Sequence, residues 1–396
     1  MTGPLDGVRV LDLSQVVAGP LAAMMLAEQG ADVIKVEGPT GEMTRLQGPD
    51  DVNALIANDN RGKRSVIVDL AADGGADVVR RLAKTCDVVF ENFRPGVADR
   101  LGVGYDAIKA VAPDIIYVSI TGFGEDGPYA DRVALDPIIQ ALTGLVHGQT
   151  SMALPFPDLI RTLVADKSTA YTAAQAATAA LLARANGAGG QRIDIAMLDA
   201  TMAFFWPDGM SDKTFEDPAR DPMRVVDLYR LVDTADGQIV YFISTQGQLE
   251  GMWKLLGLDD YLADPDLGSL ARLGADPEKA IAASMEADGL IGAKSTAEMV
   301  ALCAEHSIPC GPVLDREAAL VDPQLVHNGV LVDWEHPTGG KLRQARPAPH
   351  FSATPAPLHP MVALAGEHTD EVLAEAGFGA DEIADLAAKG ITARVD

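Results

Sequence analysis

The sequence predicts an α/β fold, with a layered domain of parallel strands and helices followed by a second, smaller α+β domain. Strand and helix signals alternate over the first 120 residues, which is typical of parallel strands joined by crossover helices. The 396 residues correspond to two or three domains of ordinary size. Hydrophobic residues make up 48% of the chain, which is enough for large buried cores.

Short apolar runs and helically spaced runs define the elements of the first domain. Strands are expected at 8–13, 32–37, 65–70, 86–92 and 114–123, where Val, Ile and Leu predominate. Helices are expected at 18–31, 74–84 and 105–112, and Gly30 is a good terminator for the first of them. Helices of this length between strands favour parallel pairing.

After residue 123 the pattern changes. Helices are expected at 136–146 and 167–185, and 192–205 begins as a strand and continues as a helix. Three prolines mark 206–225 as a linker. The strand at 238–244 and the helical patterns up to about residue 305 indicate a small α+β domain over 226–315. Six prolines predict an extended path over 337–362, and 368–391 predicts two short helices.

Charge and cysteine usage exclude several classes of protein. The formal net charge of −26 disfavours binding to nucleic acid or to anionic lipid. The three cysteines form no CxxC pair, and the seven histidines form no HxxxH or Cys/His cluster, so no metal site is predicted. We find no signal peptide, and the one long uncharged run, 168–183, is too weakly apolar to span a membrane. These features predict a cytoplasmic protein.

One carboxylate stands at the start of the long alanine-rich helix. Asp166 follows an apolar segment and precedes Ser168 and Thr169, which are good helix starters. An aspartate in the first turn of a helix often serves only as a cap, because the helix dipole favours its negative charge. The residues alone therefore leave both a structural and a chemical role open.

The loop between the first strand and the first helix excludes a dinucleotide site. It reads SQVVAGP over 14–20 and lacks the GxGxxG pattern. Without these glycines a pyrophosphate cannot approach the backbone closely. A nicotinamide-dependent dehydrogenase is therefore not expected, although Glu37 ends the second strand where such enzymes carry an acidic residue.

Several phrases, taken in order, resemble the class III CoA-transferase family, also called the CaiB/BaiF family. The chain resembles that family nearly throughout. The phrases are the opening PLDGVRVLDLSQVVAGP, then NRGKRSVIVDL, DVVFENFRPGVADRLGVGYDAI, GFGEDGPYADR, VADKSTAYTAAQAATAALLAR, GGQRIDIAMLDA, HSIPCGPV and LAGEHTDEVLAEAG.

The resemblance implies a fold and an assembly. It implies a large Rossmann-like domain formed by both chain ends, from 1–205 and from the returning segment within 316–396. It also implies a linker at 206–225 and a small domain at 226–315. In this family two ring-like subunits interlock, so a homodimer is expected.

The resemblance also implies the chemistry. Asp166 would be the nucleophile that attacks an acyl-CoA thioester and then carries CoA as an aspartyl thioester, which is covalent catalysis. The partners would be an acyl-CoA and a free carboxylic acid, with coenzyme A as a substrate and no tightly bound cofactor. A free carboxylate is ionised at pH 7 unless it is deeply buried. The start of the helix, beside the reacting carbonyl, is a candidate for stabilising oxyanion charge.

Further site residues follow by resemblance. Asp136 and Gln15 are expected beside the reacting carboxylate. The CoA channel is expected to be lined by Val17, Ala18, Asn60, Arg61, Gly62, Lys63, Asn92, Phe93, Arg94, Arg100 and Leu101.

Departures from the family's branches narrow the activity. Formyl-CoA:oxalate transferases carry a glycine-rich loop over the site, whereas 225–250 holds only Gly237 and Gly247. Gly38 and Val17 also stand where that branch has Arg and Gln, so oxalate is a doubtful acceptor. The racemase branch uses a histidine where this chain has Leu135, which cannot exchange protons. A racemase or another CoA-thioester isomerase, and a CoA-binding protein without catalysis, remain alternatives.

Overall fold

A computed structural model of the protein describes residues 3–45, 52–150, 155–217, 219–220, 224–356, 358–359 and 361–393. The chain divides into two compact units. The first takes its residues from 1–150, 154–207 and 329–396, so both ends of the chain belong to it. The second is built from 208–328.

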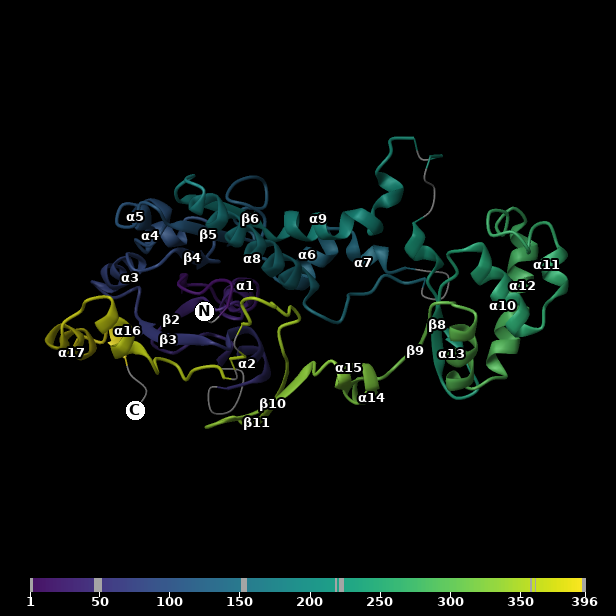
Figure 1. The fold of residues 1–396 in the computed structure, drawn as a ribbon. Coiled ribbons are helices and arrows are strands. Elements are labelled where there is room, and N and C mark those ends of the chain that lie inside the picture. Colours follow the sequence, from purple (N-terminus) through teal and green to yellow (C-terminus); the bar gives the residue numbers. More distant parts are fainter. Residues whose placement is uncertain are drawn as a thin grey trace. The chain divides into compact units, whose positions relative to one another are not determined.

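A seven-stranded sheet forms the centre of the first unit (Figure 1). Its order is β12-β3-β2-β1-β4-β5-β6. The bounds are β1 (Arg9–Asp12), β2 (Asp32–Glu37), β3 (Lys63–Val68), β4 (Val88–Glu91), β5 (Ile116–Thr121), β6 (Gln191–Ala196) and β12 (Thr392–Ala393). All pairs are parallel except β12, which runs antiparallel to β3. The predicted parallel strands are thus confirmed, and β12 is an addition that the sequence did not predict.

The sheet buries both faces, which explains the apolar runs in its strands. In β1, Val10 pairs with Val33 and Val88, and Leu11 pairs with Ile34 and Val89. Neighbouring residues point to opposite faces, so Val10 belongs to one hydrophobic core and Leu11 to another.

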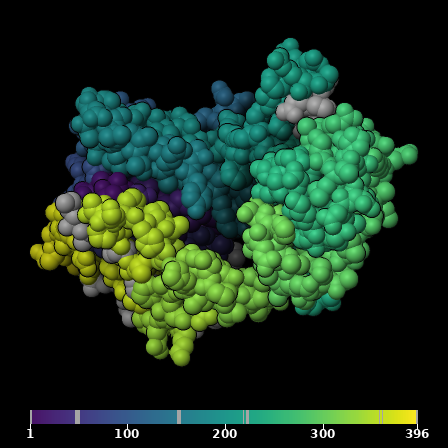
Figure 2. Space-filling model, turned by 45° about the vertical axis from the view of Figure 1, so that its right-hand side comes forward, coloured from purple at the N-terminus to yellow at the C-terminus, as the bar shows by residue number. Residues whose placement is uncertain are grey.

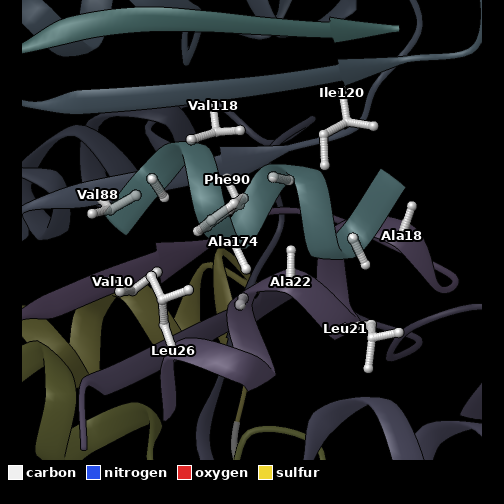
Figure 3. Packing of buried hydrophobic residues seen from close by; sticks show 14 of the residues in the cluster. Val10, Ala18, Leu21, Ala22, Leu26, Val88, Phe90, Val118, Ile120 and Ala174 are labelled. Atoms are coloured by element: carbon white, nitrogen blue, oxygen red, sulfur yellow. The ribbon is translucent and has the colours of Figure 1, made fainter. Parts of the chain in front are cut away.

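Two helices rich in small residues cover the first face. They are α1 (Ala18–Ala27) and α8 (Val164–Ala185). Figure 3 shows Ala22 of α1 and Ala174 of α8 on facing sides of this core, together with Val10, Val88 and Phe90 of the strands. Alanine lets two helix backbones approach closely, so the composition of α8 reflects its packing between the sheet and α1.

The second face is covered by helices from distant parts of the chain. They are α3 (Gly75–Ala83), α5 (Tyr105–Lys109), α16 (Thr369–Glu375) and α17 (Ala380–Ala388). Leu373 of α16 and Ile383 of α17 are buried in the same core as Leu82. Arg64 of β3 donates to Asp32 at 2.6 Å and to Glu371 at 2.9 Å. The yellow C-terminal segment accordingly lies against the purple N-terminal part in Figure 2.

Other parts of the first unit depart from the sequence prediction. The hairpin of β10 (Leu331–His336) and β11 (Gly340–Ala345) occupies part of the segment predicted to be extended. Helix α9 (Met197–Gly209) continues through Pro207 into the segment predicted as a linker, because a proline near a helix end removes only one hydrogen bond. The remaining helices are α2 (Ala54–Asn60), α4 (Val97–Arg100), α6 (Asp136–Leu142) and α7 (Leu145–Gly148).

The second unit combines a small antiparallel sheet with helices. Its strands are β7 (Val232–Asp233), β8 (Gln238–Tyr241) and β9 (Cys310–Pro312), in that order. Its longer helices are α10 (Gln246–Leu256), α12 (Pro277–Gly292) and α13 (Thr296–Glu305), and its short ones are α11 (Asp260–Ala263), α14 (Arg316–Leu320) and α15 (Pro323–His327). Ile239, Leu249 and Met299 belong to its core. This unit therefore contains both helices and antiparallel strands.

Candidate active site at the carboxyl edge of the sheet

The topology brings the start of α8 to the carboxyl edge of the sheet. At the other end of α8, Arg184 donates to Asp87 at 2.6 Å and to the carbonyl of Asp114 at 3.2 Å, and these residues precede β4 and β5. The helix has 22 residues and therefore spans the sheet from its amino edge to its carboxyl edge. In parallel α/β sheets ligands bind at the carboxyl edge, where connections from a central strand diverge. Here that point lies between β1 and β4.

Asp166 lies in the first turn of α8 and is held by a second aspartate. Asp136, the first residue of α6, accepts from the backbone N–H of Ala165 at 2.8 Å and of Asp166 at 3.0 Å. The Gln140 amide donates to the other oxygen of Asp136 at 2.5 Å. The structure thus brings together two of the residues predicted for the site. The sequence analysis names the start of this helix as a candidate for binding an oxyanion. Because Asp136 already accepts from both N–H groups, these two groups are not free for that role.

The environment makes Asp166 more basic than an ordinary aspartate. Burial, followed by the neighbouring carboxyls of Asp136 and Asp59, raises the pKa of Asp166 to about 7. Only about half of the protein would therefore carry an ionised Asp166 at pH 7. The sequence analysis expects an ionised carboxylate unless the side chain is deeply buried, and Asp166 is half-buried in the structure.

Asp59 is a third carboxyl, whose charge contributes to the raised pKa of Asp166, and sequence reasoning missed it. It belongs to α2 and is only 7% exposed. Within the described residues its Oδ2 atom is buried and has no hydrogen-bond partner. Burial raises the pKa of Asp59 to about 6. The spacing of Ile56, Asp59 and Asn60 on one face of α2 is a signal for their burial, but this short helix was not predicted.

The loop after β1 is held in a strained conformation. Val16 has a positive φ of 70°, which is unusual for a β-branched residue. Its N–H donates to Glu42 at 2.6 Å, and Lys35 beneath the loop lies 3.0 Å from Glu42. On the other side, the side chain of Asn92 exchanges two hydrogen bonds with the backbone of Gln15, at 2.8 and 2.7 Å. These contacts join the first loop to the loop after β4.

The first turn of α1 presents backbone donors beside this loop. Val17 and Ala18 are buried. In the part of the chain that the structure describes, no hydrogen bond uses the N–H groups of Ala18 or Gly19. Free N–H groups at the start of a helix attract anions and carbonyl oxygens. The close approach of Gly19 to Ser14 leaves no room for a side chain, since a Cβ would lie 2.3 Å from the Ser14 Cβ.

The basic residues at 61–63 are occupied by internal partners. Lys63 donates to Asp12 at 2.7 Å and to Asn60 at 2.8 Å, and both Lys63 and Asn60 are buried. Burial lowers the pKa of Lys63 to about 8 despite the neighbouring Asp12. Arg61 donates to Glu28 at 2.6 Å. Gly62 has a φ of 75° and packs against His359.

Two other predicted cations are exposed. Arg94 and Arg100 follow β4 and end α4. Among the described residues, neither side chain takes part in a hydrogen bond or an ion pair. Phe93 and Leu101 are partly buried and pack against the hydrophobic core on the second face of the sheet. Of the predicted basic residues, Arg94 and Arg100 are therefore the ones whose charge is available to an anionic ligand.

The position that carries a base in racemases holds no proton-exchanging group. Leu135 directly precedes α6 and is 58% exposed. His147 of α7, considered as a substitute, is also exposed.

In the described residues no three His, Cys, Asp or Glu side chains converge into a possible metal site. None of the helices within the described residues is both long and apolar enough to cross a membrane.

Comparisons with known proteins agree on one family. The sequence profile described as CoA-transferase family III matches residues 5–369. A succinate–glutarate CoA-transferase from Agrobacterium fabrum is 33% identical, over 94% of this chain and 95% of that protein. A formyl-CoA:oxalate CoA-transferase from Afipia carboxidovorans is 30% identical, over 100% of this chain and 99% of that protein. The crystal structure of a CAIB/BAIF family protein from Brucella suis matches with a TM-score of 0.80 and 29% identity, covering 95% of this chain and 100% of the other.

Proposed function

Because this chain belongs to CoA-transferase family III, we propose that it moves coenzyme A between carboxylic acids through a covalent thioester on Asp166. The family resemblance found in the sequence is confirmed. The observation that carries the proposal is the half-buried carboxyl of Asp166 at the carboxyl edge of the sheet, fixed through its backbone N–H by Asp136. A carboxyl raised to a pKa of about 7 is a stronger nucleophile, when ionised, than an ordinary aspartate.

The reaction proceeds in two exchanges. The Asp166 carboxylate attacks the carbonyl carbon of an acyl-CoA thioester, the C–S bond breaks, and the electron pair leaves on sulfur. The CoA thiolate then attacks the aspartyl carbonyl of the mixed anhydride and releases the first acid as a carboxylate. The acceptor acid reverses both steps. One difficult exchange is thereby divided into easier steps.

Coenzyme A enters as a substrate, with no tightly bound cofactor. We propose that the phosphates of CoA bind the exposed Arg94 and Arg100. The adjoining part of the CoA molecule is assigned to the free N–H groups of Ala18 and Gly19. The other predicted channel residues remain part of the proposal, which is supported by the family resemblance. They are Val17, Asn60, Arg61, Gly62, Lys63, Asn92, Phe93 and Leu101, with Gln15 beside them. In this assignment Lys63 and Arg61 shape the channel and do not neutralise phosphate, because Asp12 and Glu28 already hold them.

Relatives point to small organic acids as substrates. One named relative acts on succinate and glutarate, and another on formyl-CoA and oxalate. We propose that the substrate is a small organic acid that resembles succinate or glutarate more than oxalate. The absence of a glycine-rich segment between 225 and 250 supports this choice, since β8 and α10 are separated there by only a few residues.

Mass spectrometry of the intact protein tests the covalent step. The wild type, Asp166→Asn and the control Asp158→Asn are each incubated with a panel of acyl-CoAs and then with hydroxylamine. Asp158 is an exposed carboxylate upstream of α8, so its replacement makes the same charge change outside the site. We expect a CoA adduct, cleaved by hydroxylamine, on the wild type and the control. We expect none on Asp166→Asn, whose turnover falls at least about a thousandfold.

Other outcomes would contradict the proposal. An Asp166→Asn protein with normal turnover rules out the nucleophile. Tight CoA binding by the wild type without any adduct indicates a binding protein. Solvent deuterium at the α-carbon of an acyl-CoA, without an acceptor acid, indicates a racemase.

The resemblance also supports an assembly and a location. We infer a homodimer of interlocked rings in which 206–225 and the segment after 315 connect the large domain to the small domain at 226–315. The exposed apolar side chains of Tyr171, Leu182 and Phe204 on α8 and α9 support an interface on the first unit.

We place the enzyme in the cytoplasm, because its three cysteines are free thiols, as a reducing compartment favours.

A further inference from the structure

Two buried lysines donate hydrogen bonds to the loop after β1, residues 14–20, although lysine is rarely buried in folded proteins. Resting on the proposed function, we propose that Lys35 is a positioning residue that, together with Glu42, fixes the backbone of this loop for CoA binding. The groups that the loop offers to CoA are the free N–H groups of Ala18 and Gly19.

The contacts of Lys35 join it directly to the loop. Lys35 belongs to β2 and is almost completely buried. Its ammonium donates to the backbone carbonyl of Ser14 at 3.0 Å and lies 3.0 Å from the carboxylate of Glu42. Glu42 in turn accepts from the N–H of Val16 at 2.6 Å. One buried ion pair therefore holds two backbone groups of the loop, a carbonyl and the N–H two residues later.

Other polar backbone groups of the loop are bound as well. The N–H of Ser14 donates to Asp12 at 3.0 Å, and the ammonium of Lys63 donates to the carbonyl of Pro20 at 2.7 Å. The side-chain amide of Asn92 binds both backbone groups of the residue after Ser14. The N–H groups of the first two residues of α1 differ from these, since no acceptor in the described part of the chain binds them.

The loop needs this support because its conformation is unfavourable by itself. Val16 has a φ of 70°, a value that a β-branched residue rarely adopts. Such strain persists only where the surroundings hold it, and it gathers at ligand sites. The loop leaves β1 at the carboxyl edge of the sheet, which is where α/β sheets bind ligands. Strain at this place therefore indicates a binding role for the backbone.

The ion pair keeps its charges in spite of its burial. Burial alone would lower the pKa of Lys35, but the carboxylates of Asp12 and Glu42 outweigh this effect and raise it. Burial likewise acts against the ionisation of Asp12, but Lys63 and Lys35 together lower the pKa of Asp12. Two ammonium groups thus balance two carboxylates beneath one loop.

Stability alone does not explain why charges are kept here. A buried ion pair contributes little more to stability than well-packed apolar side chains of similar volume. Apolar side chains at 35 and 42 could fill the space, but they could neither donate to the Ser14 carbonyl nor accept from the Val16 N–H. The hold on these two backbone groups is what the charged pair adds.

Two variants separate positioning from stabilisation. Lys35→Met removes the donor to Ser14 and leaves Glu42 buried without its cation. The double variant Lys35→Met/Glu42→Gln removes both charges, so neither is left unbalanced, and the amide oxygen of Gln can still accept from Val16. The Ser14 carbonyl stays without its donor in both variants.

A matched control breaks an equivalent contact at the opposite edge of the sheet. Arg184 pairs with Asp87 at 2.6 Å and also donates to the carbonyl of Asp114. Arg184→Met/Asp87→Asn therefore removes an ion pair whose cation also holds a backbone carbonyl. Asn at this position can still accept from the N–H of Arg9.

The measurements are the CoA dissociation constant by calorimetry, KM and kcat for the acyl-CoA that gives the wild-type adduct, and the unfolding temperature. Hydrogen–deuterium exchange of the peptide that contains 14–20 reports on the loop itself. Lys35→Met should unfold about 5 °C below the wild type, because it leaves a buried charge uncompensated. The double variant should recover most of this loss.

Binding of CoA should not recover with stability. In the double variant we expect CoA affinity about tenfold weaker than in the wild type and KM about tenfold higher, the effect of losing one strong hydrogen bond. Its kcat at saturation should change less than about threefold, because the loop contributes to binding and Asp166 is intact. The amides of the loop should exchange faster. The Arg184 control should keep the wild-type affinity, KM and loop exchange.

Contrary outcomes are distinct from one another. A double variant with wild-type CoA affinity and loop exchange overturns the positioning role of Lys35. An affinity that falls and recovers in step with the unfolding temperature also overturns it, since the pair would then only stabilise the fold. A wild type that neither binds CoA nor forms an adduct contradicts the proposed function itself.

Discussion

Three aspartates of the candidate site, Asp136, Asp166 and Asp59, have different environments. Asp136 is buried and accepts from two backbone N–H groups and an amide. Asp166 is half-buried, and Asp59 is buried with one oxygen unpartnered. Hydrogen bonds stabilise a carboxylate, whereas burial without them destabilises it. The environment therefore suits Asp136 for support, and the raised pKa of Asp166 suits the nucleophilic role that we propose for it.

Replacing Asp136 should disturb α8 at its first turn. Asp136→Ala leaves two buried N–H groups of α8 without an acceptor, and we expect a loss of about 1–3 kcal/mol in the free energy of unfolding. Because Asp166 then shifts, kcat should fall at least about tenfold. Urea unfolding and steady-state kinetics measure the two effects.

The matched control is Asp315→Ala, which removes an exposed cap from α14 in the second unit. This replacement should lower the free energy of unfolding by only about 0.5–1 kcal/mol and leave kcat unchanged. An Asp136→Ala protein as stable and as active as the wild type would show that the contacts to α8 are unimportant.

At the residue scale, the family resemblance predicted Asp166 and Asp136 as site residues, but the sequence did not reveal their surroundings. Burial depends on contacts between distant segments. Arg61 is neutralised by Glu28, 33 residues away, and Lys63 by Asp12, 51 residues away. No local pattern indicates such pairs, so the sequence could not show that Arg61 and Lys63, which the resemblance places in the CoA channel, have internally paired charges.

At the scale of elements, β1, its loop and α1 together position the backbone N–H groups that we assign to CoA. The positive φ of Val16 costs about 1–3 kcal/mol and is maintained by the hydrogen bond that the Val16 N–H donates to Glu42 and by the contacts between Gln15 and Asn92. The close contact of Gly19 with Ser14 sets where α1 begins relative to this loop.

Gly19→Ala should therefore displace the loop. The new Cβ would lie 2.3 Å from the Ser14 Cβ, so the loop or the helix must move. We expect a loss of about 1–3 kcal/mol in stability and a raised KM for acyl-CoA. Calorimetry of CoA binding and thermal unfolding measure both.

Gly247→Ala in α10 is the matched control, because nothing lies within 4 Å of its added Cβ. Alanine in that helix should raise stability by about 0.5–1 kcal/mol without affecting CoA binding. Equal CoA binding by Gly19→Ala and the wild type would contradict the role given to this close contact.

Elements with long apolar or periodic signals were predictable, and short or polar ones were not. The strand at Asp32–Glu37 was predicted to the residue, because it is apolar and buried on both faces. Helix α2 has only seven residues, three of them Asn or Asp, and its stability comes from packing and from the Asn53 cap. The two residues of β12 carry no periodicity, and they pair with β3 because of tertiary contacts.

For the whole molecule, the predicted interlocked dimer is open to direct measurement. Size-exclusion chromatography with light scattering should give twice the mass of the 41.6-kDa chain at micromolar concentration. Interlocked rings cannot separate without opening, so the mass should not change on dilution or in high salt. A mass of one chain, or a mass that falls on dilution, would contradict this assembly.

The pairing of β12 with β3 has a consequence for biosynthesis. Residues 392–393 lie beside a strand that left the ribosome more than three hundred residues earlier. Until residues 392–393 have been synthesised, the nascent protein therefore exposes an incomplete sheet edge and, before α16 and α17 are made, the apolar surface that these helices cover. Slow synthesis at low temperature should consequently favour recovery of correctly folded protein.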